Sequence, residues 1–162
     1  MLPMMAGMKL DAIDLRILDI LQHDAEQQVA EIAQQVGLST TPCWRRIQRL
    51  KAAGVITRQV ALLAAQKINV GVTVFVSVRT STHTQAWFDT FKATVQAIPE
   101  VVEFYRMSGD VDYLLRVVVP DIAAYDRVYK RLIAGTQLHD VSSSFAMEEL
   151  KLTTALPLSY AG

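Results

Sequence analysis

Arginines gather in one short stretch, "STTPCWRRIQRL", at residues 39–50. Between residues 40 and 60 the chain carries five basic side chains and no acidic one, although its formal net charge is zero. Guanidinium groups bind phosphates and the edges of guanine bases, so this block predicts a local anion-binding face. A solvated basic helix face is the simpler alternative for such a charge run.

A second stretch with possible chemistry is "RMSGDVDYLL" at residues 106–115, where Asp110 and Asp112 follow a glycine. Carboxylates accept hydrogen bonds from an ammonium group, and turn N–H groups bind a carboxylate. Together these groups describe a site for an α-amino acid. Glycine and aspartate are also what a tight turn uses, and spacing alone favours that simpler interpretation.

Two helices precede the arginine-rich stretch. Ile13, Ile17, Ile20 and Leu21 recur at helical spacing, and Asp11 is placed to cap the start of that first helix. A shorter apolar stripe over residues 29–36 is stopped by a glycine.

The arginine-rich stretch itself predicts a third helix. Ser39 is placed to cap it and Pro42 lies in its first turn, where a missing N–H costs little. Its predicted inward stripe is Cys43, Ile47 and Leu50, which leaves Trp44 and the arginines outside. Two short helices joined by "VGLS", the second with outward arginines, form a helix-turn-helix pattern, whose second helix enters the major groove of DNA. The DNA-binding candidates are Ser39, Thr40, Thr41, Trp44, Arg45, Arg46, Gln48, Arg49 and Arg58.

The remainder of the chain has a different periodicity. "VITRQVALL" predicts a short strand or ribbon, and from residue 72 the pattern is strand, helix, strand, strand, helix, strand. The strands are expected at 72–80, 101–107, 112–119 and 140–150, with helices at 85–98 and after Pro120-Asp121. The second of these helices is expected to direct Ile122 inward, toward the core. This βαββαβ order predicts a ferredoxin-like sheet with two helices on one face. The other face is apolar too, so we expect a second subunit to cover it.

These patterns predict an α+β protein with a winged helix-turn-helix domain and a ferredoxin-like βαββαβ domain. We expect a disordered tail at 1–8, the helix-turn-helix domain at 9–60, a linker at 61–71, the βαββαβ domain at 72–152 and a C-terminal tail at 153–162. A single cysteine fits a cytoplasmic protein, and no apolar run predicts a membrane span. No cofactor, metal or catalytic motif is recognisable, so we expect no enzyme.

Three segments together resemble the Lrp/AsnC family, the feast/famine regulators of bacteria and archaea. They are "LDAIDLRILDILQHD", "VAEIAQQVGLSTTPCWRRIQRLKAAGVI" and "MSGDVDYLLRVVVPD", and the resemblance covers about Lys9 to Pro157. It implies a transcriptional regulator that binds double-stranded DNA and forms homodimers, which assemble into octamers. It also implies an amino acid effector bound between the sensor domains of neighbouring dimers.

The resemblance further implies which residues bind that effector. They are Arg106, Gly109, Asp110, Asp112, Tyr113, Ile122, Ser143, Ser144 and Phe145. "FYRMSGDVDYLLRV" and "SSSFAMEELKLTTALPL" look like a branch of the family that responds to cysteine and activates cysteine detoxification. The alternative is a metabolic or regulatory protein that binds a ligand through its ferredoxin-like domain and does not bind DNA.

Overall fold

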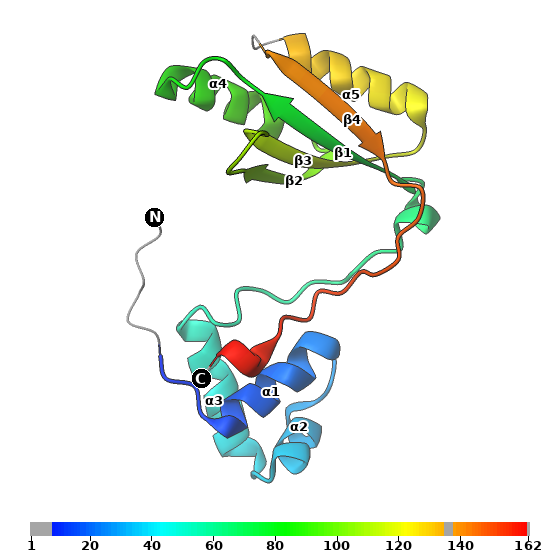
Figure 1. Cartoon of the computed structure of the whole chain (residues 1–162). Helices are drawn as coiled ribbons and strands as arrows, with labels where there is room; N and C mark the ends of the chain where they lie inside the picture. Colours follow the sequence, from blue (N-terminus) through cyan, green and yellow to red (C-terminus); the bar gives the residue numbers. More distant parts are fainter. Residues whose placement is uncertain (1–7, 135–137, 162) are drawn as a thin grey trace. The chain divides into compact units, whose positions relative to one another are not determined.

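The chain forms two compact units in a computed structural model, which describes residues 8–134 and 138–161 (Figure 1). The helical unit contains the described residues up to Ala61 and, in addition, those from Lys151 onward. The sheet unit runs from Leu62 to Leu150. The tail expected at 1–8 lies, up to residue 7, outside the described residues.

Three helices build the helical unit: α1 (Ala12–His23), α2 (Val29–Val36) and α3 (Thr40–Ala52). Asp11 caps α1 as predicted, because its carboxylate accepts the backbone N–H groups of Ile13 and Asp14. Gly37 ends α2 with φ 76°, a left-handed conformation that glycine adopts without strain. The predicted helix-turn-helix is therefore present.

The core of the helical unit uses the predicted stripes of all three helices. Cys43, Ile47 and Leu50 of α3 are buried against Ile17 of α1 and Ile32 of α2. The ribbon predicted over 55–63 was wrong, because these residues form neither helix nor strand. A strand needs a hydrogen-bonded neighbour, and no strand within residues 8–134 and 138–161 pairs with this segment.

The C-terminal segment completes this core. The side-chain amide of Gln22 in α1 holds the backbone of Leu156 at both ends: Nε2 donates to the carbonyl at 3.1 Å and Oε1 accepts the N–H at 2.8 Å. Leu158, in the short 3-10 helix η2 (Leu158–Tyr160), packs on the core of the helical unit. The predicted tail is thus, in its described part, a piece of this unit.

We expect Leu158→Ala to lower the free energy of unfolding of the helical unit by about 1 kcal/mol, because a half-buried leucine loses roughly half of what a fully buried one does. Hydrogen exchange at the α1 amides measures the loss. Leu156→Ala is the matched control, since that side chain is 72% exposed. Equal protection in the wild type and Leu158→Ala would show that the C-terminal segment does not stabilise α1.

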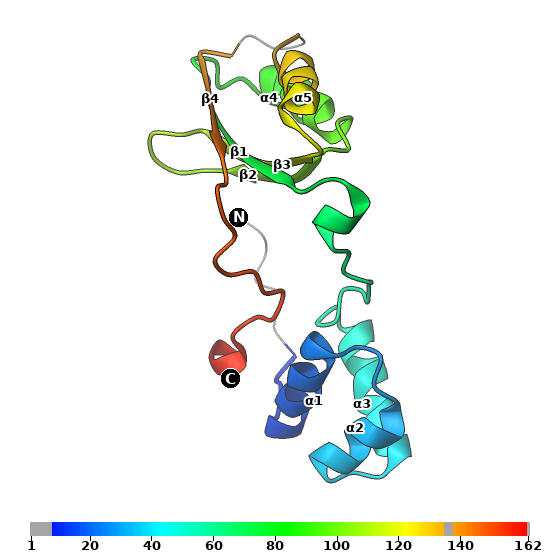
Figure 2. The ribbon, with the colours of Figure 1, turned by 90° about the vertical axis from the view of Figure 1, so that its right-hand side faces the viewer.

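The sheet unit has four antiparallel strands in the order β2-β3-β1-β4. They are β1 (Val72–Arg79), β2 (Val101–Arg106), β3 (Tyr113–Val119) and β4 (Asp140–Phe145). Helices α4 (Gln85–Gln96) and α5 (Ile122–Ala134) cover one face of the sheet (Figure 2). A short 3-10 helix, η1 (Ala65–Ile68), lies in the predicted linker before β1. The ferredoxin-like prediction is confirmed.

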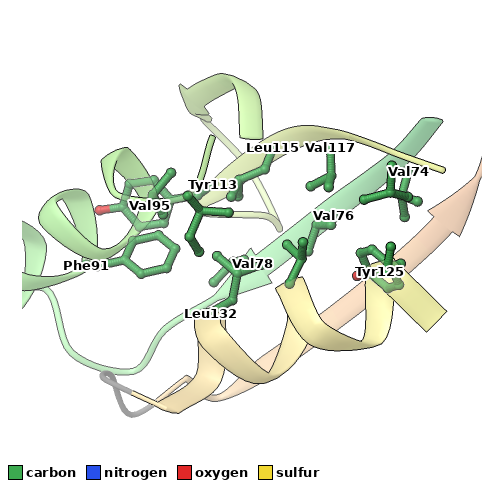
Figure 3. Packing of buried hydrophobic residues seen from close by; sticks show 14 residues of the cluster. Val74, Val76, Val78, Phe91, Val95, Tyr113, Leu115, Val117, Tyr125 and Leu132 are labelled. Carbon is green, nitrogen blue, oxygen red and sulfur yellow. The ribbon is translucent and has the colours of Figure 1, made fainter. Parts of the chain in front are cut away.

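Alternate residues of the two central strands fill the core between sheet and helices. Val74, Val76 and Val78 of β1 point toward α4 and α5, where Phe91 and Leu132 meet them (Figure 3). The residues between them point to the opposite face. There Phe75 and Tyr105 stay exposed, and Arg116 pairs with Glu103 at 2.7 Å.

Two details of the predicted sheet unit were wrong. The last strand ends at Phe145, not at residue 150, and Met147 beyond it is 96% exposed. Ile122 was expected to face the core from α5, but its side chain is exposed, because Ala124, Tyr125 and Val128 form the buried side of that helix.

Candidate DNA-binding surface and effector region

The outer side of α3 carries polar and aromatic side chains that are exposed to solvent. Thr40, Thr41, Arg45 and Gln48 are exposed, and Trp44 is 50% exposed. Arg45 makes no hydrogen bond or ion pair with any described residue. It is therefore an accessible, uncompensated positive charge at the middle of the helix.

Arg46 and Arg49 differ from Arg45 because both are held by α1. One guanidinium nitrogen of Arg46 lies 2.8 Å from Oδ1 of Asp14, and one of Arg49 lies 2.6 Å from Oδ2 of the same carboxylate. Asp14 is fully buried, so these two arginines supply the charge that makes its burial tolerable. The sequence analysis had assigned both arginines to DNA. That role remains a prediction. In the structure both arginines also have a role within the protein, because they pair with the buried carboxylate of Asp14.

Asp11 extends this cluster to the surface. Its second oxygen lies 2.6 Å from Arg46, while its first caps α1. The backbone N–H of Asp14 and the side chain of Arg46 both favour the charged form, and they lower the pKa of Asp11 below its usual value. The carboxylates of Asp11 and Asp14 raise the pKa of Arg46. We call Asp11, Asp14, Arg46 and Arg49 the α1–α3 charge cluster.

The start of α3 leaves backbone donors unoccupied. Ser39 is at the N-cap position as predicted, but its side chain makes no capping hydrogen bond. The N–H groups of Thr40 and Thr41 therefore point out of the helix without a side-chain acceptor, which is the arrangement that binds phosphates. Lys51 in the last turn of α3 and Arg58 beyond the helix add two exposed cations, neither paired with a described residue.

The cysteine of α3 has no exposed surface. Burial raises the pKa of the Cys43 thiol, and the nearby charge of Arg46 offsets that only in part. Cys43 is thus a small core residue. Among the described residues no group of three or more His, Cys, Asp and Glu side chains is placed to hold a metal ion.

The second candidate region is the turn between β2 and β3. Gly109 has φ 107°, and the N–H of Met107 donates to the carbonyl of Asp112 at 2.8 Å. The Asp112 side chain is already used, because Oδ2 accepts the backbone N–H of the buried Thr80 at 2.8 Å. Asp110 is exposed and has no partner among the described residues. Of the two carboxylates, Asp110 is the one free to meet a ligand.

The remaining effector candidates lie elsewhere on the sheet. The Ser143 hydroxyl bonds to the hydroxyl of Tyr125, and the Phe145 ring packs edge-on against Tyr125 at 5.3 Å between centroids. Ser144 points to the uncovered face and Ile122 is exposed. Since β2 and β4 are the two edges of the sheet, about 14 Å of strand spacing separates Arg106 from this group. One chain therefore does not bring all predicted effector residues together.

Family models cover both units. One of the AsnC-type helix-turn-helix domain matches residues 10–51, and one of the Lrp/AsnC ligand binding domain matches residues 73–156. The chain belongs to the Lrp/AsnC family. Its members are transcriptional regulators, so this chain is a regulator with a helix-turn-helix domain and not an enzyme.

Curated relatives within the Lrp/AsnC family match along nearly their whole length. The chain is 53% identical to the glutamate uptake regulatory protein of Zymomonas mobilis over 93% of this chain and 92% of that protein. It is 46% identical to the DNA-binding transcriptional activator DecR of Escherichia coli over 92% and 99%. The narrower resemblance in the sequence is to the branch of the family that contains DecR.

Solved structures of Lrp/AsnC proteins share the fold. An AsnC family regulator from Agrobacterium tumefaciens is 62% identical, with a TM-score of 0.90 over 93% of this chain and 99% of that one. A regulator from Neisseria meningitidis, solved as a complex with L-Met, is 34% identical, with a TM-score of 0.88 over 93% and 97%. In the described part of this chain, no helix is long and apolar enough to cross a membrane.

Sequence reasoning missed the carboxylates of the α1–α3 charge cluster. A signal was present, because Asp14 precedes the buried Ile17 by three residues and Leu18 by four, which places it on the apolar face of α1. A buried carboxylate requires a cation, and the neighbouring helix carries Arg46 and Arg49.

Proposed function

We propose that this Lrp/AsnC protein binds specific DNA sequences through α3 and that an amino acid controls the binding. The observation that supports the DNA contact is the exposed, unpaired Arg45 beside uncapped N–H groups at the start of the same helix. A guanidinium reads guanine edges in the major groove, and helix N-terminal amides hold a phosphate. Thr40, Thr41, Gln48 and Arg58 are exposed on the same unit and extend this surface.

We also propose that the effector binds where two subunits meet. The predicted effector residues form two groups on opposite edges of one sheet, one with Arg106 and Asp110 and one with Ser143 and Phe145. Each group is half a site, and a neighbouring subunit would supply the other half. The L-Met complex of the Neisseria relative supports an amino acid as the class of effector.

The identity of that amino acid is a finer proposal. The likeness to DecR favours cysteine, whereas the glutamate uptake regulator gives a second relative whose name points to another amino acid. Ser143, Ser144 and the Arg106 side chain make the predicted site polar, which supports a small polar amino acid over leucine.

The uncovered face of the sheet supports a homodimer. Phe75, Val102 and Tyr105 are exposed there, and no described residue of the same chain covers them. Pairing of two such faces would bury them, and assembly of dimers into an octamer would bring the two effector groups of neighbouring dimers together. A ligand that favours one assembly then changes the spacing of the DNA-binding helices.

Two measurements on the full chain test this function. Binding to a random-sequence duplex library, followed by selection, should enrich a defined site, and affinity for that site should fall steeply with salt. A thermal-shift panel with all twenty amino acids should raise the melting temperature with one or a few of them. A chain that enriches no sequence and shows the same melting temperature with every amino acid would favour the alternative without DNA binding.

Removing the charge of Asp110, in the turn between β2 and β3, tests whether this side chain contacts the ammonium group of the effector. We expect Asp110→Asn to weaken effector binding by about 10-fold or more, because a hydrogen bond to a charged group contributes about 1.5–3 kcal/mol. Isothermal titration calorimetry measures the dissociation constant. Asp126→Asn, on the exposed side of α5, is the matched control. Asp112→Asn is a poorer probe, since it also disturbs the hydrogen bond to Thr80.

A further inference from the structure

A pocket of about 110 Å³ opens in the sheet unit where α4 begins. Sequence reasoning assigned Arg106 and Tyr113 to the effector but missed the helix residues beside them. The pocket is lined by His83, Thr84, Gln85, Trp87, Phe88, Arg106 and Tyr113. An apolar cavity of about 150 Å³ holds benzene, so this one suits a smaller group.

Tyr113 directs an unsatisfied polar group into this pocket. Tyr113 is only 5% exposed, and its ring packs against Phe91 of α4 with centroids 5.3 Å apart (Figure 3). The ring centroid of Phe88, also on α4, lies 5.9 Å from that of Tyr113. The Tyr113 hydroxyl has no hydrogen bond to any described residue. Every fully enclosed polar side-chain atom in the described part of the chain has a partner, so this hydroxyl must reach open space. The pocket that Tyr113 lines is that space.

Arg106 brings a positive charge to the same place. It follows Phe104 by two residues on β2, and Phe104 packs on Phe91, so both side chains leave the strand toward α4. Arg106 makes no hydrogen bond or ion pair with a described residue. Burial raises the pKa of the Tyr113 hydroxyl, the charge of Arg106 lowers it and the charge of Asp112 raises it. Arg106 and Tyr113 both line the pocket.

The other polar groups at the pocket are consistent with a ligand that accepts hydrogen bonds. Thr84 caps α4 by accepting the N–H of Trp87, and the positive end of the helix dipole faces the pocket there. His83 lies 4.0 Å from Asp112, the nearest acid, whose Oδ2 is occupied by the N–H of Thr80. Trp87 and Phe88 supply apolar wall for a short carbon chain.

We propose that this pocket binds the carboxylate of a small organic acid, with the Arg106 guanidinium and the Tyr113 hydroxyl as its donors. The inference deepens the proposed function, because the acid is the amino acid effector if that function holds. The carboxylate then comes from one of two places on the effector: its α-carbon or an acidic side chain. A guanidinium matches the planar, two-oxygen geometry of either one.

Calorimetry on the full chain tests the pocket with named probes. Succinate presents a carboxylate without an ammonium group. The difference in affinity between L-cysteine and cysteamine, which lacks the α-carboxylate, measures the contribution of that group. The difference between L-glutamate and L-glutamine measures the contribution of a side-chain carboxylate. We take the carboxylate probe that binds the wild type most tightly. We expect Arg106→Gln to bind this probe at least 10-fold more weakly than the wild type does, and Tyr113→Phe to bind it about 5-fold more weakly. Arg106→Lys should recover part of the loss.

Two matched variants control for charge and for the hydroxyl. Arg127→Gln removes an exposed arginine of α5, and Tyr129→Phe removes a tyrosine hydroxyl of the same helix; neither residue lines the pocket. Both should bind the probes as the wild type does. Circular dichroism of all variants shows whether a loss of binding follows from a loss of fold.

The outcomes separate this pocket from the proposed effector function. Succinate binding that depends on Arg106 and Tyr113, with no response to any amino acid, would support the pocket and remove the effector function. Amino acid binding with equal affinity in the wild type, Arg106→Gln and Tyr113→Phe would overturn the pocket and leave the effector function intact. The pocket is also overturned if no carboxylate probe binds the wild type, or if inorganic phosphate binds more tightly than all of them.

Discussion

Asp14→Asn should lower the free energy of unfolding of the helical unit by about 2–3 kcal/mol, which corresponds to a fall in melting temperature of roughly 10 °C. The carboxylate is fully buried and serves Arg46, Arg49 and the backbone of Asp11 at once. An amide in its place removes the negative charge, keeps an acceptor oxygen for one guanidinium group and turns an NH2 donor toward the other. The loss stays below that of a fully buried pair, because both arginines keep access to water.

The same substitution should weaken DNA binding, because the α1–α3 charge cluster ties α3 to α1 and so holds α3 in its orientation within the helical unit. Differential scanning calorimetry measures the stability, and fluorescence anisotropy with a labelled duplex measures the affinity. Asp19→Asn is the matched control on α1, since its side chain is 63% exposed. If Asp14→Asn melts at the wild-type temperature, the cluster carries no net stability.

Arg45→Ala should reduce affinity for a specific duplex by about 10-fold or more and lower the slope of log affinity against log salt by about 0.9. Arg45 is exposed, unpaired and at the middle of α3, so its removal leaves the protein's own contacts intact. Arg46→Ala is not equivalent, because it also removes a partner of the buried Asp14. Its effect on DNA binding will include a loss of stability.

Arg127→Ala is the control for Arg45→Ala, because it removes one exposed arginine from the sheet unit. Both variants change the net charge equally, so a difference between them reports the position of the charge. A salt slope that is the same for wild type and Arg45→Ala would exclude a phosphate contact by this side chain. It would then leave Lys51 and Arg58 as the accessible cations of that surface.

Local signals were enough to predict the three helices of the helical unit. The spacing of Cys43, Ile47 and Leu50 predicts which side of α3 is buried, and Asp11 and Gly37 mark helix ends whose geometry depends on their own residues. The partners of Arg46 and Arg49 were not predicted. An ion pair depends on how two helices cross, which their separate periodicities do not contain.

In the sheet unit, too, local patterns predicted the elements but not the features that depend on their neighbours. Strand order followed from the βαββαβ pattern, but the end of β4 did not, because "FAMEEL" continues to alternate. β4 stops where its neighbour does: the N–H of Ala146 reaches Thr73, and β1 begins at Val72. The pocket beside Tyr113 was likewise hidden from sequence reasoning, since it arises only when the start of α4 lies beside the end of β2.

The contribution of Leu158 to the core of the helical unit has a consequence for biosynthesis. The helices α1, α2 and α3 leave the ribosome first, yet one of their partners lies beyond the entire sheet unit in the chain. The nascent DNA-binding module therefore keeps part of its apolar surface uncovered while the sensor is being translated. The core of the helical unit is complete only after the sheet unit has been translated. A chain whose translation stops within the sheet unit therefore has an incomplete core in its helix-turn-helix domain as well.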